Sequence, residues 1–276
     1  MASLKMIARL GLFLASVAIS LAITLPGTVW AGQLLPTTQI PLGVSIVQIH
    51  DDPGRSAVYA IDRVHSRILF INPEALSVTK SIYVGEDPTG LDIDEGGNVL
   101  YVANSGDGSG TPGTYRISLV DLNTQSVVTN FIIPEIYVNF SLLHAVNVTA
   151  GRQGRLYYNA GYDLWNGGMA RAMDADTGDD LGEVAGIKSV MLATFEGSRL
   201  YGQYVYYGNL GQMGVWDISS DDITQTGSYG YSPYSDDYGW RYTNYSISDD
   251  ERYVAYGQTL FASTNLSCQY GVLPEL

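Results

Sequence analysis

A pattern of four short strands recurs along this chain and limits the folds that it can adopt. The clearest copy runs from Asp87 to Pro134, where turn residues separate stretches that alternate between apolar and polar positions. A tyrosine recurs in the second strand of each copy, and a short polar residue recurs where the third strand ends. These residues are Tyr59, Tyr101, Tyr157, Tyr201 and Tyr253, and Asn72, Asp121, Asp174, Asp217 and Ser263. The pattern predicts an all-β fold built from repeated four-stranded sheets, with the polar residues capping turns.

The repeat length indicates which all-β fold this is. The third-strand turn residues are 49, 53, 43 and 46 residues apart, and a four-stranded unit of about 40–50 residues is typical of a β-propeller blade. We expect five blades in residues 32–276, at about 43–85, 86–134, 135–186, 187–231 and 232–276. They follow an isolated strand at Thr37–Gly43, which is similar to the fourth strand of the first blade, Thr79–Gly85.

The isolated strand raises a question about closure of the ring. The fifth unit already has a fourth strand of its own, at Ser267–Glu275. Thr37–Gly43 is therefore either an additional strand on a five-bladed ring, or the sign that further blades follow Leu276 in a larger ring. We favour the second interpretation, because propellers commonly use such a strand to complete the last blade and remove an open edge.

Residues 1–31 have the features of an export signal. Lys5 and Arg9 precede an apolar stretch from about Leu10 to Leu25, and small residues within 29–31 precede a cleavage point before Gly32. The stretch is short for a membrane span, which needs about 20 residues. An uncleaved anchor is the alternative. We expect the mature chain to be secreted, periplasmic or on the cell surface, with no stable membrane span.

Charge and composition argue against several classes of function. The chain has 28 acidic and 14 basic side chains, a net charge of −14, so it offers little to neutralise the phosphates of a nucleic acid. One cysteine and three histidines do not suit a zinc site or a disulfide framework. We expect His50, His65 and His144 at surface or hydrogen-bonded strand positions, and Cys268 as a small buried residue. We therefore predict no metal and no cofactor.

Three motifs in the first half of the chain resemble a known family. They are "VGEDPTG" at Val84–Gly90, "LYVAN" at Leu100–Asn104 and "VDLNTQSVV" at Val120–Val128. Together they resemble the YVTN-type β-propeller repeat family, a relative of the propellers in quinoprotein amine dehydrogenases, with Ala103 where threonine is usual. The resemblance is strong over Val44–Pro134 and weakens toward the C-terminus. It implies a secreted or surface binding module without shared catalytic residues, and a ring that commonly has seven blades.

The connections on one face of the ring are the predicted binding site. In a propeller this face carries the links from second to third strands and from each blade to the next. Several of these links are long, and long loops on a rigid scaffold are where function tends to lie: Ser105–Tyr115, Pro134–His144, Gly161–Met169, Tyr204–Gln212 and Tyr229–Asn244. Their aromatic and acidic residues suit a sugar, a cation or a peptide, although such aromatics also pack between blades. The predicted ligand-binding residues are Tyr162, Asp163, Trp165, Tyr206, Tyr207, Asp236, Asp237, Tyr238 and Trp240.

The remaining motifs leave three functions open. The segment Asp92–Gly97 begins like a calcium loop but returns to strand at Asn98, so we expect it to be the turn after a first strand. No nucleophile elbow is found for Ser/His/Asp catalysis. The leading prediction is a non-enzymatic module that binds a protein, peptide or glycan. The alternatives are a propeller enzyme of the lactonase or lyase type, and a structural envelope or surface-layer module.

The export signal leads to a direct test. Mature protein recovered from the medium or periplasm is expected to begin at Gly32, because small residues at 29–31 satisfy the cleavage rule after a short apolar run. N-terminal sequencing measures this. Recovery of chains that begin at Met1 from the membrane fraction would show that the segment is an anchor instead.

Overall fold

The computed structural model shows a chain built from β-strands. It describes residues 42–94, 96–106, 115–134, 137–138, 141–142, 145–160, 169–184, 191–193, 197–206, 209–220, 223–229, 245–247, 253–256, 259–262 and 269–272. Within these ranges every regular element is a strand and no helix is present, so none of them contains a helix long and apolar enough to cross a membrane. The predicted signal at 1–31 lies outside the described residues.

The described strands form five antiparallel sheets of four strands and one two-stranded ribbon. Each large sheet is a meander, in which every strand pairs with the next along the chain. Sheet 1 consists of β1 (Ile46–Asp52), β2 (Ala57–Asp62), β3 (Arg67–Asn72) and β4 (Ser77–Tyr83), and sheet 2 of β5 (Pro88–Ile93), β6 (Val99–Asn104), β7 (Arg116–Asp121) and β8 (Ser126–Ile132). Sheet 3 consists of β11 (Ala145–Ala150), β12 (Arg155–Ala160), β13 (Met169–Asp174) and β14 (Asp180–Val184), and sheet 4 of β15 (Met191–Ala193), β16 (Arg199–Tyr206), β17 (Asn209–Asp217) and β18 (Thr224–Tyr229). Sheet 5 consists of β19 (Tyr245–Ile247), β20 (Tyr253–Tyr256), β21 (Thr259–Ala262) and β22 (Gln269–Val272). The ribbon is β9 (Tyr137–Val138) with β10 (Ser141–Leu142).

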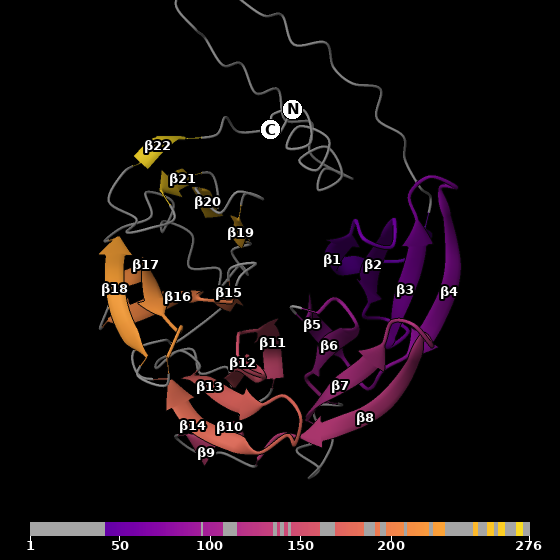
Figure 1. The fold of residues 1–276 in the computed structure, drawn as a ribbon, viewed down its shortest axis with the longest axis horizontal. Coiled ribbons are helices and arrows are strands. Elements are labelled where there is room, and N and C mark those ends of the chain that lie inside the picture. Colours follow the sequence, from indigo (N-terminus) through magenta and orange to yellow (C-terminus); the bar gives the residue numbers. More distant parts are fainter. Residues whose placement is uncertain are drawn as a thin grey trace, which may run out of the picture.

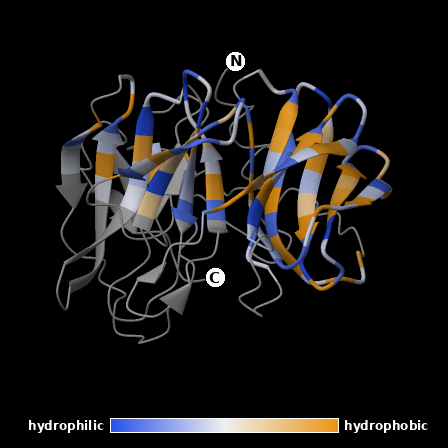
Figure 2. Ribbon diagram, turned by 90° about the horizontal axis from the view of Figure 1, so that it is seen from below, coloured by the Kyte–Doolittle hydropathy of each residue, from blue (hydrophilic) through white to orange (hydrophobic). Residues whose placement is uncertain are grey.

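The five sheets are arranged around a common centre. Figure 1 shows the first strand of each sheet nearest the centre and the fourth strand at the rim. In the side view of Figure 2, the strands run from one face of the ring to the other. This is a β-propeller, which confirms the predicted all-β fold class. The number of blades in a complete ring stays a prediction.

The middle strands of sheet 2 are apolar on both faces, and sheets 1 and 3 cover those faces. Tyr59 and Phe70 of sheet 1 pack with Leu91 and Leu100 of sheet 2. Successive side chains of a strand point to opposite faces of the sheet, so the residues adjacent to Tyr59 and Phe70 face away from sheet 2. Ala60, for example, lies in a separate cluster on the opposite face of sheet 1. Sheets 1 and 2 therefore carry apolar clusters on both of their faces.

The repeated tyrosines of the second strands fill these layers. Tyr59 lies between sheets 1 and 2, Tyr101 between sheets 2 and 3, and Tyr157 between sheets 3 and 4. All three are buried. The Tyr59 hydroxyl donates a hydrogen bond of 2.8 Å to Asp52 Oδ2, so its polar end is satisfied. The sequence repeat thus has a packing cause in sheets 1 to 3, because each of them places one large aromatic ring against the next sheet.

The predicted isolated strand lies almost wholly outside the described residues. Of Thr37–Gly43, only Leu42 and Gly43 are described, and they precede β1 without being part of a strand. Leu42 packs against the cluster on the face of sheet 1 that points away from sheet 2. The prediction about Thr37–Gly43 and closure of the ring therefore stays a prediction.

The aromatic layers predict a large difference between two tyrosines. Tyr157→Ala is expected to lower the free energy of unfolding by about 3–5 kcal/mol, because it leaves a cavity between two sheets. Tyr83→Ala, on the outer strand β4 and 55% exposed, is the matched control and is expected to cost less than about 1 kcal/mol. Denaturant unfolding followed by circular dichroism measures both. Equal losses in the two variants would contradict this account of the tyrosine repeat.

Candidate functional site

The contacts between turns show which connections lie on the same face of the ring. Arg152 N donates a hydrogen bond of 3.2 Å to Gly197 O, so the β11–β12 turn lies beside the β15–β16 turn. Arg55 in the β1–β2 turn contacts Gly97 O in the β5–β6 turn in the same way. We call the side that carries these turns the turn face. Second and fourth strands run away from it and end at the opposite side, the junction face, at Asp62, Tyr83, Asn104, Ile132, Ala160, Val184, Tyr206 and Tyr229.

The predicted ligand-binding residues belong to links that start at the junction face. Among them, Tyr206 alone lies in the described part of the chain, as the last residue of β16. The others lie outside the described residues: Tyr162, Asp163, Trp165, Tyr207, Asp236, Asp237, Tyr238 and Trp240. The strands that precede them are described, and β12, β16 and β18 all end at the junction face. These links therefore leave the sheets on one side of the ring.

One of the links that we expected to be long is a short hairpin. In the pairing of β16 with β17, Tyr204 lies opposite Gln212 and Tyr206 lies opposite Asn209. The prediction of a long loop at Tyr204–Gln212 is therefore wrong, because most of this segment continues the two strands. Glycines at this point of the sequence suggested a loop, but cross-strand pairing accommodates Gly211 within β17.

A buried carboxylate organises the junction face of sheet 1. Asp62 is fully buried and accepts hydrogen bonds from Arg67 Nε (2.7 Å) and His65 Nδ1 (2.8 Å). Burial alone would raise the pKa of Asp62, but the bonds from Arg67 and His65 outweigh it and hold that pKa below its ordinary value. Beside it, Arg63 NH2 donates to Asp87 Oδ2 (2.9 Å) in the link to sheet 2. His65 is thus hydrogen-bonded, as predicted.

Two of the family-like motifs join sheet 1 to sheet 2. Asn104, at the end of "LYVAN", is buried and its Nδ2 donates to Ser118 Oγ (3.0 Å). Ser118 Oγ lies 2.7 Å from Asn130 Oδ1 and also contacts Val84 O in the link between the sheets. Gly85 follows with a φ of +137°, and a Cβ there would lie only 2.8 Å from Asn104 Oδ1. These motif positions therefore have scaffold roles in this chain.

The repeated turn residues cap turns on the turn face, as predicted. Asp121 Oδ1 accepts hydrogen bonds from Asn123 N (2.7 Å) and Thr124 N (2.8 Å). These backbone donors hold the pKa of the Asp121 carboxyl below its ordinary value, and the same arrangement lowers the pKa of Asp174. The residues with this contact are Asn72, Asp121, Asp174 and Asp217. Ser263 lies outside the described residues.

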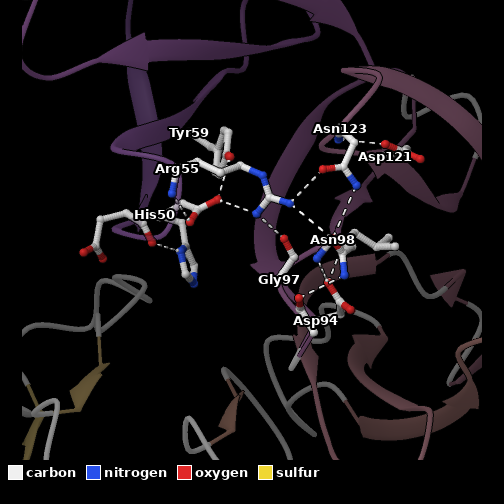
Figure 3. A network of polar contacts seen from close by, with 12 residues as sticks. His50, Arg55, Tyr59, Asp94, Gly97, Asn98, Asp121 and Asn123 are labelled. Carbon is white, nitrogen blue, oxygen red and sulfur yellow. Dashed lines mark hydrogen bonds and ion pairs between the residues drawn. The ribbon is translucent and has the colours of Figure 1, made fainter.

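Arg55 clamps the turn faces of sheets 1 and 2 together. Its NH1 donates to Asp52 Oδ2 (3.1 Å) and to Gly97 O, and its NH2 donates to Asn98 Oδ1 (3.3 Å) and Asn123 Oδ1 (3.2 Å). Figure 3 shows the guanidinium group between the turn of its own sheet and two turns of the next. A single side chain therefore fixes three turns. No sequence pattern singled it out.

The motif that begins at Asp92 contains the end of β5 and the β5–β6 turn, in agreement with the prediction of a turn after a first strand. Asp94 Oδ1 accepts hydrogen bonds of 2.6 Å from both Asn98 N and Val99 N, which closes the β5–β6 turn. Within the described ranges, no three His, Cys, Asp or Glu side chains gather as metal ligands would. His144 and Cys268 lie outside those ranges, so the predictions of their positions stay predictions.

Sequence reasoning missed one further polar residue, Asp92. It lies on the first strand β5 between two apolar residues, and its carboxylate contacts His50 of sheet 1 and Thr149 of sheet 3. A charged residue at an inward position of a first strand is a signal that would have identified it. The polar groups described so far bind one another within sheets or across them, so this part of the ring is a scaffold.

Comparisons with known proteins support the fold. No family model and no curated protein matches the sequence. Among solved structures, hydrazine synthase of Kuenenia stuttgartiensis matches with a TM-score of 0.52 and 14% identity, over 90% of this chain and 62% of that one. A functionally unknown protein from Desulfotomaculum acetoxidans DSM 771 matches with a TM-score of 0.59 and 15% identity, over 84% and 70% of the two chains. The β-propeller domain of Myceliophteria thermophila Cps50 (Swd1) matches with a TM-score of 0.56 and 12% identity, over 82% and 67%.

These likenesses extend to the fold alone. At 12–15% identity they show a β-propeller and carry no activity over to this chain. The chain also spans less than two thirds of the length of the hydrazine synthase chain.

The Arg55 clamp predicts a difference between two arginines. Arg55→Ala is expected to lower the free energy of unfolding by about 1–3 kcal/mol, because it removes the cation paired with the nearly buried Asp52 carboxylate and the side-chain donor to a carbonyl of the next sheet. Arg63→Ala, whose side chain is 44% exposed, removes an ion pair on the junction face and is expected to cost less than about 1 kcal/mol. Urea unfolding of both variants tests this. The account of the clamp is wrong if Arg63→Ala proves the more damaging change.

Proposed function

We propose that the chain is an exported, non-enzymatic β-propeller module that binds a protein, peptide or glycan through aromatic loops of its junction face. The observation that carries this proposal is the shared direction of β12, β16 and β18. All three strands end at the junction face, and each is followed by a segment of sequence that contains aromatic residues. The two longer segments, after β12 and β18, contain both tyrosine and tryptophan and thus start from one side of the ring, where β16 also ends with Tyr206 and is followed by Tyr207.

Sheets 1 and 2 show how strand ends are fixed on the junction face, and this suits a binding role for that side of the ring. On the junction face of sheets 1 and 2, Asp62 and Asn104 are buried and hydrogen-bonded, and Arg63 bridges to Asp87. A strand end that is fixed in this way positions whatever loop follows it. Binding residues are commonly placed on loops above a rigid framework, because loops change in sequence at little cost to the fold.

The residues of the loops favour particular ligands. Tyr162, Trp165, Tyr238 and Trp240 offer aromatic faces, on which sugars stack and cationic groups bind. Aspartates accompany them in the same segments. The net charge of the chain, −14, also favours a neutral or basic partner over an acidic one. A glycan or a basic peptide segment fits this chemistry best.

The likeness to YVTN-type repeats is consistent with such a role. The matching motifs, among them "LYVAN" at Leu100–Asn104, supply buried strand and link residues that hold sheets together. We propose that the chain is a relative of that family and that residues 1–31 direct its export. The relation supports a binding module because that family, as a group, has no common catalytic residues.

Two tryptophan substitutions test the proposal. The double variant Trp165→Ala/Trp240→Ala is expected to keep its far-ultraviolet circular dichroism while its binding on a glycan array and to extracted envelope proteins falls at least about tenfold. Trp216→Ala is the matched control, because Trp216 is buried between sheets 3 and 4 and its loss is expected to unfold the chain at a lower temperature.

The outcomes of this experiment separate the binding module from the structural alternative. Unfolding of the double variant would mean that the two tryptophans are packing residues, and the proposed site would be lost. A folded double variant whose binding equals that of the wild type would place the site elsewhere. A wild-type protein that binds nothing in either assay would favour the structural envelope module.

A further inference from the structure

Asp92 lies where the inner strands of three sheets meet. Its Oδ1 atom, on β5 of sheet 2, is 3.1 Å from His50 Nε2 on β1 of sheet 1. Its Oδ2 atom accepts hydrogen bonds from Thr149 Oγ1 (2.7 Å) and Ala150 N (2.9 Å) on β11 of sheet 3. One carboxylate therefore connects sheets 1, 2 and 3 at the strands nearest the centre of the ring (Figure 1).

His50 faces a hydrogen-bond acceptor at each of its ring nitrogens. Nδ1 lies 2.9 Å from the backbone oxygen of Asp51, and Nε2 lies 3.1 Å from Asp92 Oδ1. Figure 3 draws the first of these two contacts at the His50 ring. A backbone carbonyl only accepts. The Asp92 carboxylate is also already an acceptor for Ile93 N, Thr149 Oγ1 and Ala150 N.

This geometry determines the protonation state that fits. A neutral imidazole carries one N–H and would satisfy only one of the two acceptors. The imidazolium carries two and satisfies both. The arrangement around His50 is therefore complete only when the ring is protonated.

We propose that His50 is a pH-dependent clamp of the ring. As an imidazolium it ties the inner strand of sheet 1 to Asp92, and through Asp92 to sheet 3. When the ring loses its proton, one of its two hydrogen bonds is lost and so is its charge, and sheet 1 is held less firmly to its neighbours.

The charged groups around His50 also favour the protonated form of its ring. The groups that face His50 are Asp92 from β5, Asp51 on its own strand and Tyr59, its cross-strand neighbour on β2. From β11 comes only the uncharged Thr149, through Asp92. Burial and the hydrogen bond to Asp52 raise the pKa of Tyr59 well above its ordinary value, so its hydroxyl stays neutral. Both charged neighbours are carboxylates, which favour the imidazolium.

The direction of the pH effect follows from these contacts. Burial works to lower the pKa of His50, but the hydrogen bond to Asp92 and the charge of that carboxylate outweigh it and raise the pKa above 6.5. A raised pKa in the folded state means that the stabilisation is complete below the unfolded value of about 6.5 and is lost as the pH rises through the folded value. The side chain is 33% exposed, so it exchanges protons with solvent.

His65 provides a matched comparison. It also contacts a carboxylate, with Nδ1 2.8 Å from Asp62 Oδ2. Both residues belong to sheet 1, so this pair joins no two sheets. The His65 side chain is 54% exposed.

A proton titration of the full chain by nuclear magnetic resonance tests the proposal. The sequence contains three histidines, so the imidazole signals are few, and the one that disappears in His50→Gln belongs to His50. We expect that signal to titrate above about 6.5 and to move to lower pH in Asp92→Asn. A His50 that titrates at or below about 6.5 in the wild-type protein would overturn the proposal. This result is decisive even if Asp92→Asn does not fold.

Thermal unfolding tests the effect of the clamp on the ring. Between about pH 5.5 and pH 8, the melting temperature of the wild type and of His65→Gln is expected to fall. His50→Gln keeps an amide that can donate to Asp92 but has no proton to lose, so its melting temperature is expected to fall by less than half as much. An unchanged pH dependence in His50→Gln would contradict the proposal.

Discussion

The apolar faces of the middle strands are the constraint on which this structure depends. In β2 and β6, five of six residues are buried, which means that side chains on both faces of the sheet are covered. A four-stranded sheet of this kind would expose two apolar faces if it stood alone, and the cost grows with the apolar area left in water. Around sheet 2, sheets 1 and 3 remove that cost. Repeating the sheet around a centre is the geometry that gives each one such neighbours.

A second constraint comes from the first strands, whose inner edge has no neighbouring strand. Their free backbone groups are satisfied by side chains instead. The side chain of Gln48 donates to Leu91 O and accepts from Leu91 N, each at 3.1 Å, and Asp92 Oδ1 accepts from Ile93 N. Because these side chains belong partly to the adjacent sheet, satisfying the edge also binds the sheets together. Arg55 does the same on the turn face.

Features that are local and periodic could be predicted from the sequence. Strand alternation and the repeated tyrosines identified the propeller, and short polar residues such as Asp121 identified the turns that they cap. Contacts between sheets could not be predicted, because His50 and Asp92 are 42 residues apart and no local pattern links them. The hairpin at Tyr206 was mistaken for a loop because glycine is permissive in both settings. The binding roles of Trp165 and Trp240 stay predictions.

The interdependence of the sheets is the central claim, and residue-resolved hydrogen exchange under native conditions tests it most directly. The account predicts that the amides of Leu91 and Ile93, held by side chains, are protected, and that the middle strands of sheets 1 and 2 open together with one free energy. Exchange of sheet 1 at a clearly lower free energy than sheet 2, with Leu91 and Ile93 unprotected, would contradict it.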